Sequence, residues 1–207
     1  MKDDANRTFW QKYARLYSTA MKSSGGLYGE ICGLIRPKLG GGARVLELAC
    51  GTGQLTFQLC ECAAQYDATD FSDAMITEAK KRACPPQLHF SVQDATHLPY
   101  PPASFDAVII SNALHIMPEP TKALAEIKRV LKPDGTLFAP TFVHSEGRAF
   151  KLRVKIMELG GFRVFHHWNA EQFVDFLNQN GFAVEESCLI GGSISPLCFA
   201  AARPEKT

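Results

Sequence analysis

The segment that most constrains the fold of this chain runs from Val45 to Gln54, with the sequence VLELACGTGQ. A short apolar run leads into a turn of small residues, after which apolar side chains continue at helical spacing at Leu55, Leu59 and Ala63. A glycine-rich turn between a strand and a helix lets a ligand approach the main chain and points the free N–H groups of the helix at it. Turns of this kind belong to nucleotide-type cofactor sites at the carboxyl ends of strands in open α/β sheets.

The spacing within the turn indicates which cofactor binds there. A dinucleotide fingerprint needs a third glycine in G-x-G-x-x-G, whereas Gln54 stands three residues after Gly51. Glu47 precedes the turn, where an acid repels a pyrophosphate but can hold an ammonium group. The strand expected over 66–69 ends in Asp70, which is placed to accept hydrogen bonds from both hydroxyls of a ribose. A ligand with an amino-acid end and a ribose describes S-adenosylmethionine, so the sequence predicts this cofactor.

Four motifs, in order, resemble one family. VLELACGTG at 45–53 is similar to the first motif of class I S-adenosylmethionine-dependent methyltransferases, in the branch of the ubiquinone/menaquinone-biosynthesis methyltransferases. ATDFSDAMITEAKKR at 68–82 resembles the family's second strand and helix, and QDATHLPYPPASFDAVIISNALHIM at 93–117 its adenine-binding turn and fourth strand. LKPDGTLF at 131–138 resembles the turn into the fifth strand, and the resemblance extends over residues 6–203.

The resemblance implies the fold class as well as the cofactor. It implies an α/β, Rossmann-like, seven-stranded and mostly parallel sheet in the order 3-2-1-4-5-7-6, whose last strand is antiparallel. Helices cover both faces, and the N-terminal helices form a lid. One domain over 1–207 is expected. Its parts are the N-terminal helices (1–42), the cofactor-binding core (43–140), an acceptor-side cover (141–181) and a C-terminal hairpin (182–207).

Apolar periodicity predicts the elements of this sheet. Two N-terminal helices are expected over 8–21 and 28–39, separated by Ser23-Ser24-Gly25-Gly26. Alternating strands and helices then predict a parallel, doubly wound sheet. The expected strands are 43–48, 66–70, 87–92, 105–111 and 135–140, and the expected helices are 53–64, 72–82 (with Ser72 as N-cap) and 119–131. A turn is expected at Lys132-Pro133-Asp134-Gly135.

After residue 141 the pattern changes. A helix near 147–159 and an aromatic-rich stretch (Phe162, Phe165 and Trp168) should precede a helix over 169–179, with Gly181 as its C-cap. Two final strands are expected over 182–190 and 194–202, joined by Gly191-Gly192-Ser193.

Composition excludes several classes of function. A chain of 207 residues is long enough for one well-buried domain and too short for two. A formal net charge of +1 without a basic stripe argues against a nucleic-acid partner. The N-terminus shows no secretory signal, and no run approaches the ~18 apolar residues of a membrane span. Seven cysteines without a disulfide framework indicate a reduced, cytoplasmic protein, and no metal-binding spacing is present. The oligomeric state is left open.

The turn and the resemblance together assign cofactor contacts to Glu47, Ala49, Gly51, Gly53, Asp70, Phe71, Asp94, Ala95 and Ser111. At the two glycines a side chain would collide with the ligand or strain the turn. Ala49 replaces the family's first glycine, and its carbonyl should face the methionine amine. By resemblance, Asp94 accepts from the adenine amino group and the Ala95 N–H donates to a ring nitrogen, although Asp94 in a simple Asx-turn is an open alternative. Phe71 could pack on the adenine or only in the core.

Candidate catalytic residues are fewer. The segment from Ser111 to His115 should lie where donor and acceptor meet, and His115 is the best-placed general base because its unperturbed pKa of ~6.5 is near operating pH. A histidine satisfied on a short helix is an equal alternative. Tyr17 ends an aromatic stripe with Phe9, Trp10 and Tyr13, which can either stabilise a sulfonium from the lid or simply pack. His144, His166 and His167 are weaker candidates on the acceptor side.

The sequence therefore predicts an S-adenosylmethionine-dependent methyltransferase for a small molecule, working by in-line transfer through positioning and desolvation. A methyltransferase-like module that binds the cofactor without turnover is the main alternative, and a nicotinamide-dependent oxidoreductase is a weaker one. His115-Ile116 stands where ubiquinone-type enzymes carry Arg-Asn, which argues against a quinone precursor. The acceptor atom (carbon, oxygen, nitrogen or sulfur) is not specified by the sequence.

Overall fold

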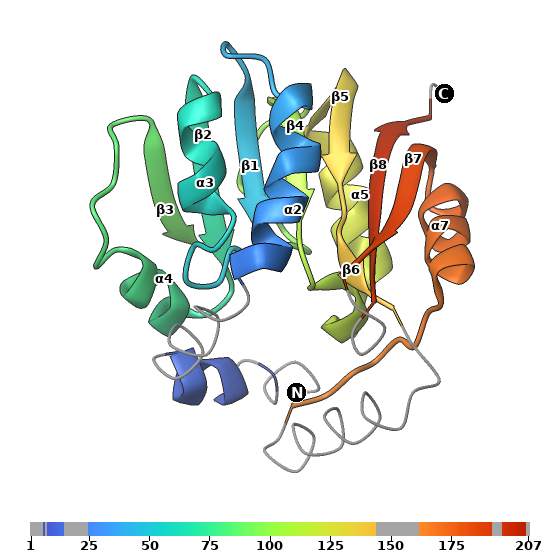
Figure 1. The fold of residues 1–207 in the computed structure, drawn as a ribbon, viewed down its shortest axis with the longest axis horizontal. Coiled ribbons are helices and arrows are strands. Elements are labelled where there is room, and N and C mark those ends of the chain that lie inside the picture. Colours follow the sequence, from blue (N-terminus) through green and yellow to red (C-terminus); the bar gives the residue numbers. More distant parts are fainter. Residues whose placement is uncertain (1–5, 7, 15–24, 144–161, 192–195, 206–207) are drawn as a thin grey trace.

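The computed structural model describes residues 6, 8–14, 25–143, 162–191 and 196–205. These residues build one twisted sheet with helices on both faces (Figure 1). The strands are β1 (Arg44–Leu48), β2 (Gln65–Asp70), β3 (Leu88–Val92), β4 (Phe105–Ile110), β5 (Leu131–Phe138), β6 (Thr141–Phe142), β7 (Phe182–Ile190) and β8 (Leu197–Pro204). The helices are an N-terminal one over 8–14, α2 (Gly25–Ile35), α3 (Thr56–Leu59), α4 (Asp73–Ala79), α5 (Pro120–Val130) and α7 (Ala170–Gln179). Short 3₁₀ turns are η2 (Arg36–Lys38), η3 (Cys60–Cys62) and η4 (Leu114–Ile116).

The strand order is β3-β2-β1-β4-β5-β8-β6, and β7 pairs with β8 along the other edge of β8, from Leu197 to Pro204. The pairs among β1 to β5 are parallel, while β8 runs antiparallel to β5, β6 and β7. The predicted sixth and seventh strands are β7 and β8, so the expected order 3-2-1-4-5-7-6 is confirmed. The two-residue strand β6 is an addition that the sequence analysis missed.

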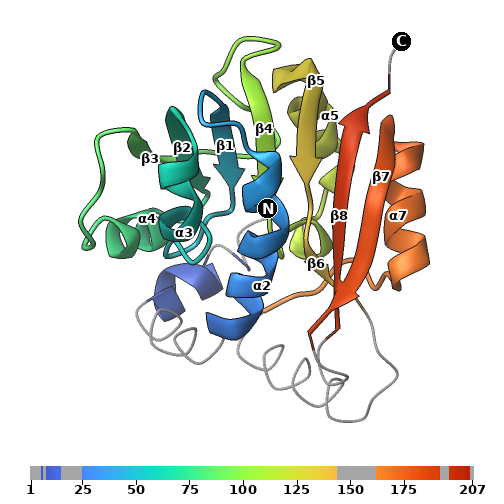
Figure 2. The same ribbon diagram turned by 45° about the horizontal axis from the view of Figure 1, so that its top comes forward.

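Alternation of side chains along the strands divides the core between the two faces. In β1, Val45 packs in the cluster under α2 and α3, whereas Leu46 and Leu48 pack in the cluster under α5 and α7. Figure 2 shows α2 in front of the sheet and α5 and α7 behind it. Because both faces are covered, the functional surface is confined to the strand ends and the edges.

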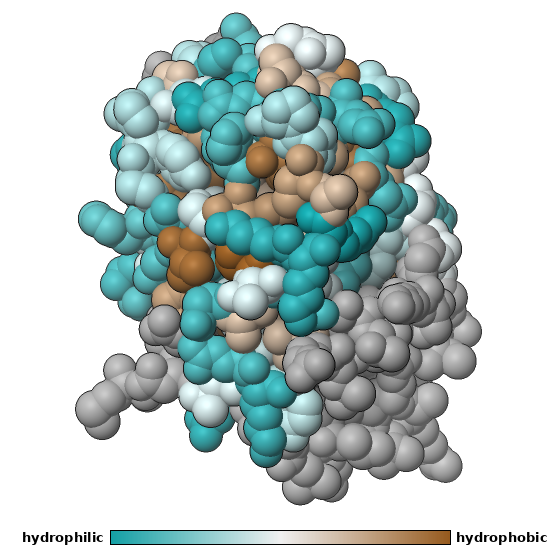
Figure 3. Space-filling view, turned by 90° about the vertical axis from the view of Figure 1, so that its left-hand side faces the viewer, coloured by the Kyte–Doolittle hydropathy of each residue, from teal (hydrophilic) through white to brown (hydrophobic). Residues whose placement is uncertain are grey.

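Strand β3 is an edge strand that, within the described residues, pairs with β2 alone. Figure 3 views the molecule from this side and shows hydrophobic patches set among hydrophilic residues. Val92, at the end of β3, is 44% exposed. None of the helices described by the structure is long and apolar enough to cross a membrane.

Three element boundaries differ from the sequence expectation. Helix α2 begins at Gly25, so Gly25 and Gly26 belong to a helix and not to a linker. The N–H groups of a first helical turn have no intrahelical partner, so this turn tolerates glycine. The buried side chains of Ile31 and Ile35 hold the rest of the helix against the core. The expected helix over 53–64 begins only at Thr56 and tightens into η3, because the left-handed turn before it continues through Gly53.

The third difference lies in β5. The expected turn over 132–135 falls within the strand as an irregularity. Phe105 of β4 pairs with Leu131, but Ala107, two residues later, pairs with Thr136, so β5 has extra residues at this point.

The N-cap role of Ser72 is confirmed, since its hydroxyl accepts from the Met75 N–H at 3.3 Å. Gly181 has a φ of +80° directly after α7, as its C-cap role requires. The expected helix over 147–159 and residues 192–195 of the hairpin connection lie outside the described residues.

Candidate active site

A cavity of about 170 Å³ opens at the carboxyl ends of β1, β2, β3 and β4. Eight of the nine predicted cofactor residues line it: Glu47, Ala49, Gly51, Asp70, Phe71, Asp94, Ala95 and Ser111. These residues come from four different strand ends, which a parallel sheet brings to one edge. The ninth, Gly53, is not among the described lining residues.

The small-residue turn after β1 is held in a left-handed conformation. The φ angles are +54° at Ala49, +57° at Gly51 and +86° at Gly53. A Cβ atom at Gly53 would lie 2.5 Å from the Phe57 ring, so this glycine is required by the turn and its packing. Ala49 adopts a conformation that costs a non-glycine residue about 1 kcal/mol or more, a strain that is typical of functional sites.

Asp70 fastens the turn to the next strand. Its Oδ2 accepts from the Gly51 N–H at 2.8 Å, and its Oδ1 accepts from the Ser72 N–H at 2.8 Å. Burial raises the pKa of Asp70 to about 6, against the lowering effect of these backbone hydrogen bonds. Each carboxylate oxygen has a second lone pair, so the residue can hold the turn and still accept from a ligand.

Glu47 lies deeper in the same wall and is only 2% exposed. The Thr56 hydroxyl donates to its Oε2 at 2.6 Å, and the Tyr66 hydroxyl donates to the same atom at 2.8 Å. Burial raises the pKa of Glu47 to about 7, although both hydrogen bonds oppose this rise. A buried carboxyl with few compensating charges is suited to binding a cationic group, because the cation restores the interactions lost on desolvation.

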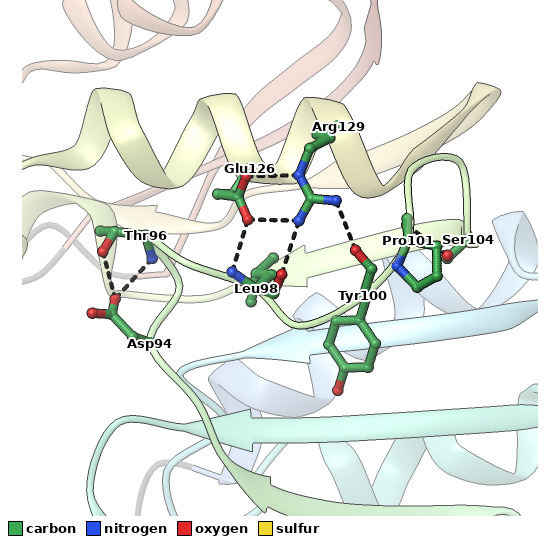
Figure 4. A network of polar contacts seen from close by, with 8 residues as sticks. All are labelled: Asp94, Thr96, Leu98, Tyr100, Pro101, Ser104, Glu126 and Arg129. Carbon is green, nitrogen blue, oxygen red and sulfur yellow. Dashed lines mark hydrogen bonds and ion pairs between the residues drawn. The ribbon is translucent and has the colours of Figure 1, made fainter.

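Asp94 forms the Asx-turn that the sequence analysis left open. Its Oδ1 accepts from both the N–H and the hydroxyl of Thr96, at 2.8 and 2.7 Å (Figure 4). The residue also lines the cavity, together with Ala95 and Thr96. Both described bonds engage Oδ1, so the turn is compatible with a ligand contact through Oδ2.

A charged pair on α5 anchors the chain that follows this loop (Figure 4). Arg129 donates to the Leu98 carbonyl at 2.9 Å and to the Tyr100 carbonyl at 2.7 Å. Glu126 accepts from the Leu98 N–H at 2.7 Å and pairs with Arg129 through both oxygens. The hydrogen bonds from Arg129 lower the pKa of Glu126 to about 2, so the pair stays charged. The loop is therefore fixed from behind by side chains that do not line the cavity.

The end of β4 contributes Ser111 and Asn112. Asn112 has a φ of +52°, and its Oδ1 accepts from the Phe142 N–H at 3.1 Å. The predicted general base, His115, is buried at 9% exposure and is not among the described residues that line the cavity. Its ring lies edge-on to Phe142, with 6.5 Å between centroids. The side chain of His115 on η4 is thus packed in the interior and not at the cavity wall, and its role as a general base stays a prediction.

The remaining catalytic candidates are only partly described by the structure. Tyr17 and His144 lie outside the described residues. His166 has one ring nitrogen 3.1 Å from the Met117 carbonyl, and burial lowers the pKa of its ring. Neither His166 nor His167 is among the described lining residues.

Several lining residues were not predicted. They include Asn6, Tyr28, Gln54, Met75 and the run Ile116 to Glu119. Trp10, part of the aromatic stripe, also lines the cavity, which agrees with a lid position for the first helix. The signal that could have found Ile116 to Glu119 is their place directly after the fourth strand; Asn6 gave no signal.

Residues 46–139 match the model of the methyltransferase-domain family. This segment is a methyltransferase domain. The resemblance to class I S-adenosylmethionine-dependent methyltransferases is thereby confirmed. The matched segment runs from the middle of β1 to the residue after β5, and it includes all nine of the predicted cofactor residues.

Among curated proteins, the chain is 44% identical over 103 residues to a demethylmenaquinone methyltransferase of Renibacterium salmoninarum. That match covers 50% of this chain and 43% of the relative, so the chain spans less than half the length of the relative it matches.

Solved structures share the fold of the methyltransferase domain. One is a putative methyltransferase in complex with the Trm112 methyltransferase activator of Haloferax volcanii, with a TM-score of 0.80, 18% identity, and coverage of 95% of this chain and 98% of that one. Another is the trans-methyltransferase CalH in complex with SAH, with a TM-score of 0.68, 22% identity, and coverage of 84% and 54%. At these identities the likeness concerns the fold.

Proposed function

We propose that the protein is an S-adenosylmethionine-dependent methyltransferase for a small molecule. The observation that carries the proposal is the cavity at the strand ends, where the left-handed turn at Gly51 lies between two buried acids, Glu47 and Asp70. A cationic amino-acid end fits Glu47 and a ribose diol fits Asp70, whereas a pyrophosphate would meet repulsion from both. Family membership of residues 46–139 supports the same cofactor.

The residues then have distinct roles in holding the donor. Glu47 faces the ammonium group, and the strained Ala49 presents its carbonyl to the same end. Asp70 accepts from the ribose while keeping the turn in place through the Gly51 N–H. Asp94 and the Ala95 N–H bind the adenine edge, and Phe71 lies against its face. When bound, S-adenosylmethionine supplies the methyl group for transfer.

The acceptor side of the wall contains Trp10, Ile116, Met117 and Pro118 and is largely apolar. Among the described lining residues there are four carboxylates and no lysine, arginine or histidine. We infer that the acceptor is an uncharged or cationic small molecule, because an anionic one would be repelled by this wall. The demethylmenaquinone methyltransferase relatives name one uncharged class to test, although His115-Ile116 departs from the Arg-Asn pair of ubiquinone-type enzymes.

The described residues position the donor and exclude water from it, and the predicted general base, His115, is not among the described residues that line the cavity. Trp10 and Ser111 line the same cavity, and a ring that covers this cavity would exclude water, which favours an in-line displacement at a sulfonium. Acceptors that need no early loss of a proton suit such a site best. The predicted single domain, cytoplasmic location and lack of a nucleic-acid partner form part of the same proposal.

The decisive experiment is a thermal-shift titration with S-adenosylhomocysteine, NAD and NADP. A native-state ligand stabilises the protein in proportion to its occupancy, so the melting temperature should rise with S-adenosylhomocysteine alone. A rise with NAD and none with S-adenosylhomocysteine would overturn the proposal. Release of S-adenosylhomocysteine from S-adenosylmethionine across a panel of quinols, phenols and amines separates an enzyme from a binding module.

A further inference from the structure

Three segments far apart in the chain meet at the side chain of Asn6. Its Nδ2 donates to the Ile116 carbonyl at 2.9 Å and to the Arg163 carbonyl at 3.0 Å. Its Oδ1 accepts from the Arg163 N–H at 2.8 Å. One amide thus ties the first helix to η4, which is 110 residues away, and to a segment 157 residues away. Asn6 also lines the cavity.

The segment that Asn6 reaches, residues 162–166, is independently attached to η4. The N–H groups of Phe165 and His166 both donate to the His115 carbonyl at 3.0 Å. The His166 ring nitrogen lies 3.1 Å from the Met117 carbonyl. Main-chain groups of His115 and Met117 therefore fix residues 162–166 beside Ile116. The Asn6 amide then joins the first helix to both η4 and residues 162–166.

Aromatic contacts set the first helix on the same surface. Phe9 lies 5.4 Å and Trp10 lies 5.6 Å from the Phe162 ring, measured between centroids. Trp10 lines the cavity as well. On the opposite side of the helix, Gln11 donates to Asp73 on α4 at 3.0 Å, at an exposed position that is not among the described lining residues.

We propose that Asn6 is a positioning residue that holds Trp10 over the bound donor, a role that rests on the proposed function. Apolar and ring contacts have no fixed direction, whereas three hydrogen bonds to two backbone segments define one placement of the helix. Only an amide supplies two donors and an acceptor at this position, because aspartate lacks the donors and alanine lacks all three. Opening of this amide contact precedes release of the donor product.

The chain offers a direct optical reporter of this placement. Its two tryptophans are Trp10, in the cavity wall, and Trp168, which stacks on His166 and Phe176 away from it. In a Trp168→Phe background, Trp10 alone reports the cavity. Stopped-flow fluorescence then measures the dissociation of S-adenosylhomocysteine when excess S-adenosylmethionine displaces it.

In that background, Asn6→Ala should raise the dissociation rate of S-adenosylhomocysteine by about tenfold or more, as expected for the loss of several hydrogen bonds that hold the closed form. Asn6→Asp, which keeps the acceptor for Arg163 and loses both donors, should raise it similarly. Gln11→Ala removes one hydrogen bond from the same helix outside the cavity, and its rate should stay within about twofold of the parent.

Three outcomes decide between the explanations. Unchanged dissociation in Asn6→Ala, with a lower melting temperature, assigns Asn6 a purely structural role and overturns the inference. Equal acceleration in Gln11→Ala also overturns it, because any loosening of the helix would then suffice. A parent that fails to bind S-adenosylhomocysteine contradicts the proposed function instead. If Asn6→Ala loses its circular-dichroism spectrum, Asn6→Asp and Asn6→Ser provide the same measurement.

Discussion

The cavity has two walls that are built in different ways. The donor wall, defined as residues 47–54, 69–72 and 93–96, consists of strand ends whose main chains are joined directly, as in the 2.9 Å bond from the Cys50 N–H to the Thr69 carbonyl. The cover, defined as the first helix, η4 and residues 162–166, depends on side chains that bridge 110 and 157 residues of sequence. The comparison teaches that the sheet fixes where the donor binds, while closure over it depends on a few contacts that can be removed separately.

The largest effect is expected at the donor wall from Gly51→Val. A β-branched residue at a φ of +57° is strongly strained, and its side chain would block the approach of the ligand to the turn. Binding of S-adenosylhomocysteine should weaken by about 3 kcal/mol or more and disappear from a thermal-shift assay. The control is Gly42→Ala, where a new Cβ meets no atom within 4 Å. Persistent binding in Gly51→Val would mean that the turn is not the donor wall.

Glu47, a buried acid of the donor wall, should lower the free energy of unfolding while it contributes to the binding of S-adenosylhomocysteine. The pKa of Glu47 rises from 4.5 unfolded to about 7 folded, so the folded state keeps a proton that the unfolded state has released. The free energy of unfolding of the ligand-free protein should therefore fall by about 3 kcal/mol as pH rises from about 4 to 7. Glu47→Gln should remove this loss and melt at higher temperature than the parent at pH 8, yet bind S-adenosylhomocysteine less tightly.

The matched control for this pH series is Glu61→Gln, an exposed carboxylate on η3. It should leave the pH dependence of unfolding intact, as followed by urea denaturation at each pH. If Glu47→Gln were instead less stable than the parent at pH 8, the Glu47 carboxylate would be charged in the ligand-free protein and stabilised there by its hydrogen bonds.

Affinity should separate Asp70, the acid of the donor wall, from a second acid of the same strand. Asp70→Ala should weaken binding of S-adenosylhomocysteine by about 1–3 kcal/mol, the scale of lost hydrogen bonds to a charged group. Asp67→Ala is the comparison, because Asp67 is a buried acid of the same strand that is not among the described lining residues. Calorimetry should show normal affinity for the second variant. If Asp70→Ala bound S-adenosylhomocysteine as tightly as Asp67→Ala, the ribose would be held by residues other than Asp70.

The cover is tested by removing residues 1–22. The sheet begins at Arg44 and α2 at Gly25, so circular dichroism should report a folded core. Affinity for S-adenosylhomocysteine should fall by about tenfold, close to 1.4 kcal/mol, since the contacts of Asn6 and Trp10 are lost while the donor wall remains. Full affinity in the truncated protein would restrict the cover to the remaining segments.

The smallest effect is expected behind the donor wall at Arg129. Arg129→Lys keeps the charge but loses the planar fork that reaches the Leu98 and Tyr100 carbonyls together. The free energy of unfolding should fall by about 1 kcal/mol, with affinity for S-adenosylhomocysteine nearly unchanged. Arg203→Lys, in an exposed pair with Glu185, should cost less than about 0.5 kcal/mol. If Arg129→Lys lost more affinity for S-adenosylhomocysteine than free energy of unfolding, the network would have to be counted as part of the donor wall.

The donor wall could be predicted from the sequence because its features are local. The acid, the small-residue turn and the acid at the next strand end are each encoded by neighbouring residues, and parallel strands bring them together without further information. The start of α3 was placed three residues too early because the expected helix start at Gly53 ignored the left-handed φ that the turn imposes there. Gly25 and Gly26 were misassigned because burial of the α2 face outweighs the low helix propensity of glycine.

The cover could not be predicted in the same way. Asn6 carries no periodicity or motif, and its role depends on backbone groups at Ile116 and Arg163 that only the folded chain brings near. His115 stood at the right place in sequence, but the direction of its side chain depends on how η4 turns after β4. Residue type and position can suggest a base; only the packing of η4 decides whether it faces the cavity.

The 157-residue separation between Asn6 and Arg163 also sets an order of events during synthesis. A ribosome adds about 5–20 residues per second, so the first helix waits roughly 8–30 s before its partner exists. Loops within β1 to β4 close over far shorter separations and can form meanwhile. The aromatic face of Phe9 and Trp10 thus cannot contact Phe162 until late in synthesis, and a nascent chain stalled before residue 162 would leave that face without this cover.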